Sequence, residues 1–263
     1  MPELQDRFRK LSEIGEKALV LFVTAGDPPL DQLPAILACL EEAGADVIEL
    51  GIPFSDPIAD GPTIQASSQR ALDRGVTPSA VIESLSKCSV GVPVVLMGYY
   101  NPVLRIGLRE FAQQAREAGA SGTIISDLTP EESEPWVSAS RQAGLDTIFL
   151  VAPTSTPERI KMACRDSTGF VYAVSRTGVT GTSDSLPAEV SGLVAGVKAC
   201  TETPVCVGFG ISKPEHVRSV CEVADGAVVG SWLVDSLARE WDDGRGSSKI
   251  GQSIRALKAA AKR

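Results

Sequence analysis

The chain has 263 residues, of which 33 are acidic and 25 basic, so its formal net charge is −8. The basic residues are scattered rather than clustered, which argues against a nucleic acid or an acidic membrane surface as partner. The N-terminus lacks an apolar signal-peptide stretch, and no apolar run approaches the roughly 18 residues of a membrane span. We expect a cytoplasmic protein whose six cysteines are reduced core residues, since none forms a C-x-x-C pair.

Short runs rich in Val, Ile and Leu recur along the chain without polar alternation, which is typical of strands buried on both faces. They lie at residues 19–25, 46–51, 92–98, 123–127, 146–152, 169–175, 204–209 and 226–230. Segments with helical spacing separate them, and several open with helix-start signals. These signals are Thr77-Pro78, Thr129-Pro130 with Glu132 as a capping box, Thr156-Pro157, and Ser212 with Glu215. Strand then helix, eight times, predicts a (β/α)8 TIM barrel that forms one catalytic domain over residues 1–263.

An open doubly wound sheet is the alternative fold, because it also alternates strands with helices. Such sheets often carry the dinucleotide motif G-x-G-x-x-G. Here Gly208-Phe-Gly210 is followed by Ile, Ser and Lys213, so the third glycine is missing. Two connections, 52–76 and 176–188, exceed ordinary loop lengths, and on a barrel they predict lids or extra helical segments over the site.

Two carboxylates stand where a barrel places its active site, at the carboxyl ends of the strands. Glu49 ends the second strand, and strand alternation points it into the barrel mouth while Leu50 packs outward. Asp60 follows in a loop that Pro57 and Pro62 stiffen. In a dry pocket, burial and a neighbouring charge drive the pKa values of two such carboxyl groups apart. This separation is what a catalytic acid and base pair needs. A salt-bridged strand-end glutamate and a turn aspartate are the alternative interpretations.

Glycine-rich segments close the seventh and eighth strands, at 208–212 and 226–231. On a barrel this is the usual phosphate site, although each segment alone also fits a tight turn. A third stretch, 176–184, follows the sixth strand and has the glycines and hydroxyls to fold over a ligand; a merely mobile loop is the alternative.

Missing residue types also narrow the chemistry. None of the eight predicted strands contains a lysine, which disfavours a Schiff-base mechanism on a barrel strand. His216 is the only histidine, and the cysteines form no ligand set, so a metal site is disfavoured. Carboxylate acid–base catalysis on a phosphorylated small molecule remains.

The motifs resemble those of the tryptophan synthase alpha chain family along almost the full chain. They are Phe22–Pro28, Glu49–Gln65, Tyr99–Pro102, Ser175–Gly181, Val207–Ile211 and Val229–Ser231. The resemblance implies a carbon–carbon lyase that splits indole-3-glycerol phosphate into indole and glyceraldehyde 3-phosphate, with no cofactor in this chain. It also implies an α2β2 complex, in which a beta chain with pyridoxal phosphate uses the indole for tryptophan synthesis. The loop around Pro53 and Asp56 matches the region that touches that partner.

The same resemblance assigns roles to individual residues. Glu49 matches the general acid that protonates the indole at C3 and later takes the proton of the side-chain hydroxyl. Asp60 matches the carboxylate that holds the indole N–H and stabilises the cation. The substrate-binding candidates are Phe22 and Ile64 as apolar walls, Tyr172 in the pocket, Thr180 in the closing loop, Phe209 beside it, and Gly181, Gly210, Gly230 and Ser231 at the phosphate.

Four positions depart from the family pattern: Leu21, Ser126, Thr129 and Trp232. We expect the first three to change loop stiffness near the barrel mouth, and Trp232 to alter packing behind the phosphate site. Two other functions stay open. A stand-alone lyase that releases free indole would have the same active site, whereas a weakly catalytic, phosphate-binding regulatory subunit would need neither acid.

Overall fold

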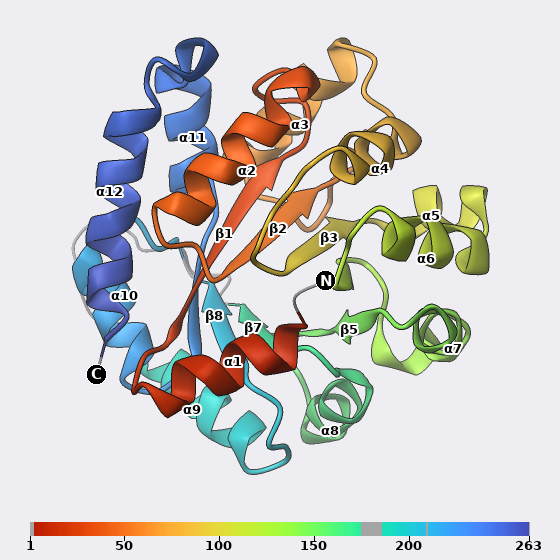
Figure 1. The fold of residues 1–263 in the computed structure, drawn as a ribbon. Helices are drawn as coiled ribbons and strands as arrows, with labels where there is room; N and C mark the ends of the chain where they lie inside the picture. Colours follow the sequence, from red (N-terminus) through yellow and green to blue (C-terminus); the bar gives the residue numbers. More distant parts are fainter. Residues whose placement is uncertain (1–2, 175–185, 209, 263) are drawn as a thin grey trace.

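Parallel strands form one sheet in the computed structural model, which describes residues 3–174, 186–208 and 210–262 (Figure 1). The strands are β1 Ala18–Thr24, β2 Val47–Gly51, β3 Val94–Gly98, β4 Gly122–Ile125, β5 Asp146–Ile148, β6 Leu150–Val151, β7 Val171–Val174, β8 Val205–Gly208 and β9 Gly226–Val229. Their order across the sheet is β5-β4-β3-β2-β1-β9-β8-β7-β6.

The two outer strands of this order, β5 and β6, are one chain segment interrupted at Phe149. β5 pairs with β4, and β6 pairs with β7. The Tyr172 amide donates to the Phe149 carbonyl across the interruption, at 3.0 Å. The sheet therefore curves round into a nearly closed barrel, and the eight predicted strands are confirmed, with the fifth split in two.

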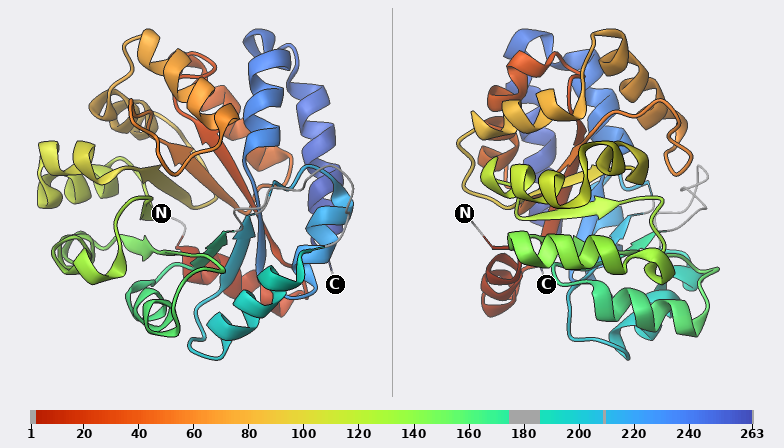
Figure 2. Two further views of the ribbon diagram at one scale, coloured as in Figure 1. Left: turned by 180° about the vertical axis from the view of Figure 1, so that it is seen from behind. Right: turned by 90° about the vertical axis from the view of Figure 1, so that its right-hand side faces the viewer.

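Helices surround the strands in both views of Figure 2. They are α1 Leu4–Glu13, α2 Leu33–Glu42, α3 Pro62–Asp73, α4 Pro78–Ser86, α5 Tyr100–Ile106, α6 Leu108–Glu117, α7 Glu134–Ala143, α8 Pro157–Asp166, α9 Ala188–Lys198, α10 Pro214–Cys221, α11 Ser231–Glu240 and α12 Ser247–Ala260. Three short 3₁₀ helices span Leu30–Gln32, Pro130–Glu132 and Asp242–Gly244. The long connection 52–76 contains the extra helix α3, as predicted.

Two of the four predicted helix starts are confirmed. Thr77 and Thr156 each accept a hydrogen bond on the side chain from the third residue of the helix that follows. The capping box at Thr129 is wrong: only a 3₁₀ turn follows, and the Thr129 hydroxyl bonds the Glu131 carboxylate instead. The start at Ser212 is also wrong, because α10 begins two residues later, with Lys213 at its N-cap.

The core has two layers. The inner layer fills the barrel and is closed at the amino ends of the strands by α1, whose Leu4, Phe8 and Leu11 pack beneath it. The outer layer lies between strands and helices. Val47 belongs to the inner layer and Ile48 to the outer one, so the predicted alternation along β2 is confirmed.

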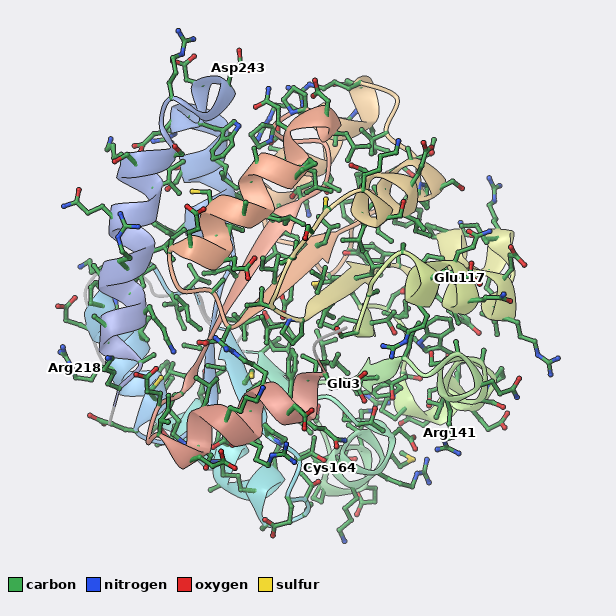
Figure 3. All side chains as sticks on the ribbon, in the orientation of Figure 1. Glu3, Glu117, Arg141, Cys164, Arg218 and Asp243 are labelled. Atoms are coloured by element: carbon green, nitrogen blue, oxygen red, sulfur yellow. The ribbon has the colours of Figure 1, made fainter. Side chains whose placement is uncertain are left out.

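Charged side chains gather on the outside of the helices. Figure 3 labels Glu117 on α6, Arg141 on α7 and Arg218 on α10, all at the periphery. In the part of the chain that the structure describes, no helix is long and apolar enough to cross a membrane.

A buried carboxylate joins both ends of the chain to the amino end of the barrel. Asp46, which is 0% exposed, accepts hydrogen bonds from Arg7 of α1 at 2.6 Å and from Lys258 of α12 at 2.9 Å. It also accepts from the Leu19 amide of β1 at 2.7 Å. One side chain thereby ties two terminal helices to the first strand.

We expect Asp46→Asn to lower the free energy of unfolding by about 3 kcal/mol, because it removes the buried anion that Arg7 and Lys258 share and leaves Lys258 with Glu16 alone. Urea unfolding of the variant and the wild type measures the difference. An exposed ion pair, Glu83 with Lys87, provides the control, and Glu83→Gln should change stability far less than Asp46→Asn. Equal effects of the two substitutions would contradict this ranking.

Candidate active site

Glu49 projects from β2 into the barrel interior. Across the sheet its backbone is in register with Phe22 on β1 and Val95 on β3. The side chain is 0% exposed, and neither carboxyl oxygen has a hydrogen-bond partner among the described residues. Burial raises the pKa of Glu49 to about 8. At neutral pH this carboxyl is therefore mostly protonated and can donate a proton.

Asp60 lies in the loop between β2 and α3, and a tyrosine directly after β3 holds it. The Tyr99 hydroxyl bonds the Asp60 carboxylate and accepts a hydrogen bond from the Ala59 amide at 3.1 Å. The Tyr99 ring stacks on Phe54 of the same loop, with ring centroids 5.1 Å apart. Burial raises the pKa of Asp60, against the opposing effect of the Tyr99 hydrogen bond.

A small cavity lies at the carboxyl ends of β1 to β4 and is lined by both Asp60 and Tyr99. Two other lining residues, Thr24 and Ser126, have buried hydroxyl oxygens without a hydrogen-bond partner among the described residues. The cavity holds about 10 Å³, which is room for about one water molecule. A larger ligand can enter only if the lining side chains move.

The predicted apolar walls, Phe22 and Ile64, also line this cavity. The Phe22 ring covers Gly51, where an added Cβ would lie 2.5 Å from the ring. A Cβ on Gly230 would lie 3.8 Å from Phe22 and 3.9 Å from Ile64. The structure thus brings a predicted phosphate-site glycine beside both apolar walls.

Tyr172 occupies the opposite side of the barrel, on β7. Its hydroxyl packs over Gly208, where an added Cβ would lie 2.7 Å from the oxygen. Burial, together with the charges of Glu49, Cys206 and Asp60, raises the pKa of Tyr172.

The predicted phosphate residues follow β8 and β9. Gly210 is exposed and has a φ of 84°, a conformation that favours glycine. Gly230 precedes α11, and Ser231 is its exposed first residue, so backbone N–H groups at this helix start are available to an anion. Three further candidates, Thr180, Gly181 and Phe209, lie outside the described residues.

Tyr99 is the site residue whose role the sequence interpretation missed. Tyr99 belongs to the Tyr99–Pro102 motif. Its position directly after an apolar strand is the sequence feature that could have identified it as a site residue. Among the four departures, Leu21 is fully buried in the outer core and Ser126 lines the cavity. Trp232 on α11 packs against the outer core.

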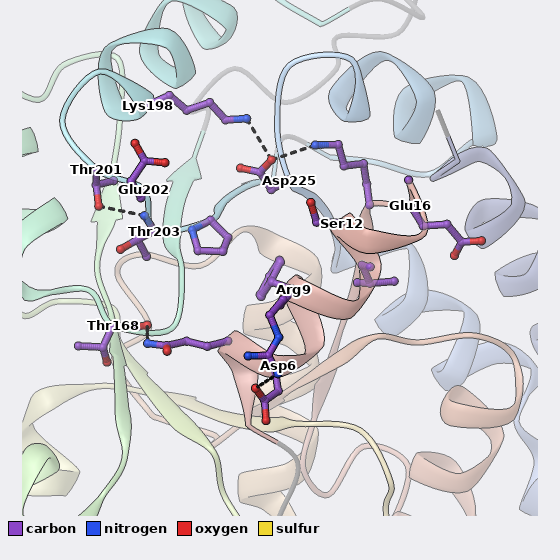
Figure 4. A pocket seen from close by; sticks show the side chains of 16 residues that line it. Asp6, Arg9, Ser12, Glu16, Thr168, Lys198, Thr201, Glu202, Thr203 and Asp225 are labelled. Carbon is purple, nitrogen blue, oxygen red and sulfur yellow. Dashed lines mark hydrogen bonds and ion pairs between the residues drawn. The ribbon is translucent and has the colours of Figure 1, made fainter.

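A larger cavity, of about 700 Å³, lies at the other end of the barrel beside α1 (Figure 4). Asp225 sits there between Lys17 and Lys198, at 2.9 and 3.1 Å. None of the predicted site residues lines it, and it faces the amino ends of the strands. In a barrel that end serves stability, so the small cavity beside the acids is the candidate active site.

The raised pKa of Glu49 predicts a pH-dependent stability. Between its usual pKa of 4.5 and about 8, the unfolded chain loses the proton that the folded protein keeps, so stability falls as pH rises through this window. We expect the unfolding free energy of Glu49→Gln, which stays neutral at every pH, to rise relative to that of the wild type by on the order of 4 kcal/mol between pH 4 and pH 9. Urea unfolding at each pH measures it, and a constant difference would contradict the burial argument.

Comparison with known proteins identifies relatives along nearly the whole chain. The family model described as tryptophan synthase alpha chain matches residues 8–262. The tryptophan synthase alpha chain of Geobacter sp. (strain M21) is 49% identical over 236 residues, covering 89% of this chain and 88% of that protein. The one from Burkholderia mallei (strain NCTC 10229) is 43% identical over 263 residues, covering 99% and 97%.

Solved structures have the same fold. Tryptophan synthase subunit alpha from Legionella pneumophila strain Paris superposes with a TM-score of 0.90 at 35% identity, covering 99% of this chain and 98% of that one. A chain of Mycobacterium tuberculosis tryptophan synthase gives 0.90 at 36% identity, covering 100% and 99%. With both acids in place at the carboxyl end of the barrel, the chain belongs to the tryptophan synthase alpha chain family.

Proposed function

We propose that this chain is the lyase subunit of a tryptophan synthase, and that it cleaves indole-3-glycerol phosphate into indole and glyceraldehyde 3-phosphate. The observation that carries the proposal is Glu49, a fully buried carboxyl whose two oxygens lack a partner in the described part of the chain. Burying a carboxyl group without hydrogen-bond partners costs folding free energy. An acid with a pKa shifted in this way is therefore a candidate catalytic group. Membership of the family supports the choice of substrate and reaction.

Glu49 begins the reaction as an acid. It transfers its proton to C3 of the indole ring, which leaves a positive charge on the ring and a carboxylate on the protein. That carboxylate then takes the proton of the adjacent side-chain hydroxyl. The carbon–carbon bond breaks, its electron pair returns to the ring, and an aldehyde forms. The proton count balances and the step needs no redox partner.

Asp60 stabilises the cation between these two proton transfers. Its carboxylate accepts the indole N–H, and its negative charge lies near the developing positive charge in a partly dry pocket. The Tyr99 hydroxyl keeps this carboxylate oriented before substrate binds. Phe22 and Ile64 enclose the apolar ring, with Tyr172 across the barrel.

The phosphate of the substrate binds at the carboxyl ends of β8 and β9. Backbone N–H groups at Gly210, Gly230 and Ser231 face it, together with the start of α11. Thr180, Gly181 and Phe209 complete the substrate contacts in this proposal. Residues 1–263 act as a single catalytic domain.

The partner in this proposal is a tryptophan synthase beta chain in an α2β2 complex in the cytoplasm. The name of the family supports a beta-chain partner. Pyridoxal phosphate belongs to that beta chain, and this chain works without a cofactor. The exposed side chain of Ile58, 82% accessible, lies in the loop between Pro53 and Asp60 and offers apolar surface for such a contact.

One assay tests the function. The purified chain is mixed with indole-3-glycerol phosphate, and indole is measured with and without a candidate beta chain. Turnover that increases with the beta chain supports the proposal. Absence of turnover in both conditions would overturn it, and full activity unchanged by the partner would point to a stand-alone lyase.

We expect Glu49→Gln to lower turnover by about 10²- to 10⁴-fold while substrate binding is retained, because the amide fills the same volume but has no acidic proton. Indole release gives kcat, and equilibrium binding of the substrate by the variant gives Kd. Near-normal turnover would show that another group is the acid.

Asp60→Asn should cause a smaller loss, on the order of 10²-fold, since the amide oxygen still accepts the indole N–H but carries no charge. The same indole assay ranks the two variants at matched substrate saturation. Inactivity as complete as that of Glu49→Gln would contradict the division of roles.

A further inference from the structure

Asp27 is a buried carboxylate that the proposed reaction does not use. It follows β1 at the carboxyl end of the barrel and is 3% exposed. Ser67 donates to it at 2.7 Å, and Arg70 at 2.6 Å through Nη2 with further contacts at 3.1 Å through Nε. Arg74 adds a hydrogen bond at 3.1 Å. All three donors lie on or directly after α3.

The carboxylate is ionised in this setting. Burial alone raises the pKa of Asp27, but the hydrogen bonds from Arg70, Ser67 and Arg74 outweigh it, so the pKa lies below its usual value. Arg70 contacts both carboxylate oxygens, a two-point arrangement that fixes orientation as well as distance. The loop after β1 and the middle of α3 are therefore held rigidly together.

The helix held in this way carries the substrate side of the site. Asp60 precedes α3 by two residues, and Ile64 lies in its first turn. Gln65, also in that turn, donates to the Asp60 carbonyl at 2.8 Å. A shift of α3 would thus move the Asp60 backbone and the Ile64 wall together.

Two more contacts limit where α3 can lie. Arg74 donates to the Gly26 carbonyl at 2.9 Å, beside the aspartate itself. A Cβ on Gly26 would lie 2.6 Å from Val76 Cγ2, so the loop after β1 touches the chain just beyond the helix. The helix α3 also packs against α11, which starts at the predicted phosphate residues.

We propose that Asp27 is a positioning residue for the lyase reaction: through Arg70, Ser67 and Arg74 it fixes α3, and α3 fixes the Asp60 carboxylate against the indole. This inference rests on the proposed function. Asp27 does not line the cavity and contacts α3 through Ser67 and Arg70. Its effect on catalysis passes through Asp60.

The test compares Asp27→Asn with Asp46→Asn in the full-length chain. Both substitutions remove a buried charge that pairs with two cations, but Asp46 lies at the opposite end of the barrel. We expect Asp27→Asn to lower kcat on the order of 10²-fold, with a smaller change in KM, because a misplacement of about 1 Å costs that much. Asp46→Asn should leave kcat per folded molecule unchanged.

Arg70→Lys should give an intermediate loss, since lysine keeps the charge without the fork.

The combination Asp27→Asn/Asp60→Asn separates positioning from general damage. If Asp27 acts through Asp60, the double variant loses little more kcat than Asp60→Asn alone. Additive losses, or a kcat of Asp27→Asn equal to that of Asp46→Asn, would overturn the proposal.

Amide hydrogen exchange over 62–73 provides a readout that does not depend on activity. Faster exchange in Asp27→Asn but not in Asp46→Asn supports the anchoring of α3, and unchanged exchange overturns it. Should the wild-type chain fail to cleave indole-3-glycerol phosphate, the proposed function fails, and the exchange measurement still decides whether Asp27 holds the helix.

Discussion

The burial of Glu49, whose carboxyl oxygens have no hydrogen-bond partner among the described residues, is the constraint on which the catalytic side of this barrel depends. A carboxyl group in that position must be neutral when the protein folds near neutral pH, and its burial raises the pKa to about 8. The surrounding residues keep it so. Val47 and Val95 continue the apolar inner layer, and Tyr172 covers the site with a group that stays protonated. The neutral form of Glu49 thus agrees with the apolar and uncharged side chains around it.

Two other buried aspartates pair with cations from the helices. Asp27 and Asp46 flank the same two strands, β1 and β2, and each is neutralised by two cations from helices. Asp46 uses Arg7 and Lys258 to join the chain ends at the amino side, whereas Asp27 binds a helix that borders the reaction site. A buried aspartate paired with two cations therefore joins the chain ends at the amino end of the barrel. At the carboxyl end, the same kind of ion pairing holds the helix that borders the reaction site.

Much of the fold follows from local patterns. The apolar runs gave the eight strands, and alternation alone placed Glu49 inside and Leu50 outside. The capping box failed because Glu131 competes for the Thr129 hydroxyl. The interruption of the fifth strand at Phe149 could not be predicted, because the apolar run is continuous there.

Contacts over long sequence distances were beyond such reasoning. Asp27 and Arg70 are 43 residues apart, and Tyr99 meets a loop that lies 40 residues earlier. Nothing in residue spacing signals these pairs, since they depend on how strands and loops meet in three dimensions. The positions of Glu49 and Asp60 at the barrel mouth were accessible from the sequence because strand ends converge in any barrel of this kind, whereas the roles expected for them rest on the family resemblance.

The pairing of β1 with β9 has a consequence for how the protein is made. Ala18 of β1 pairs with Gly226 of β9, so one edge of β1 stays unpaired until almost the entire chain has been synthesised. A ribosome exposes that apolar strand long before its partner is synthesised, and open edges of this kind associate with other chains. The synthesis of β9 is thus the step at which completion of the barrel competes with aggregation.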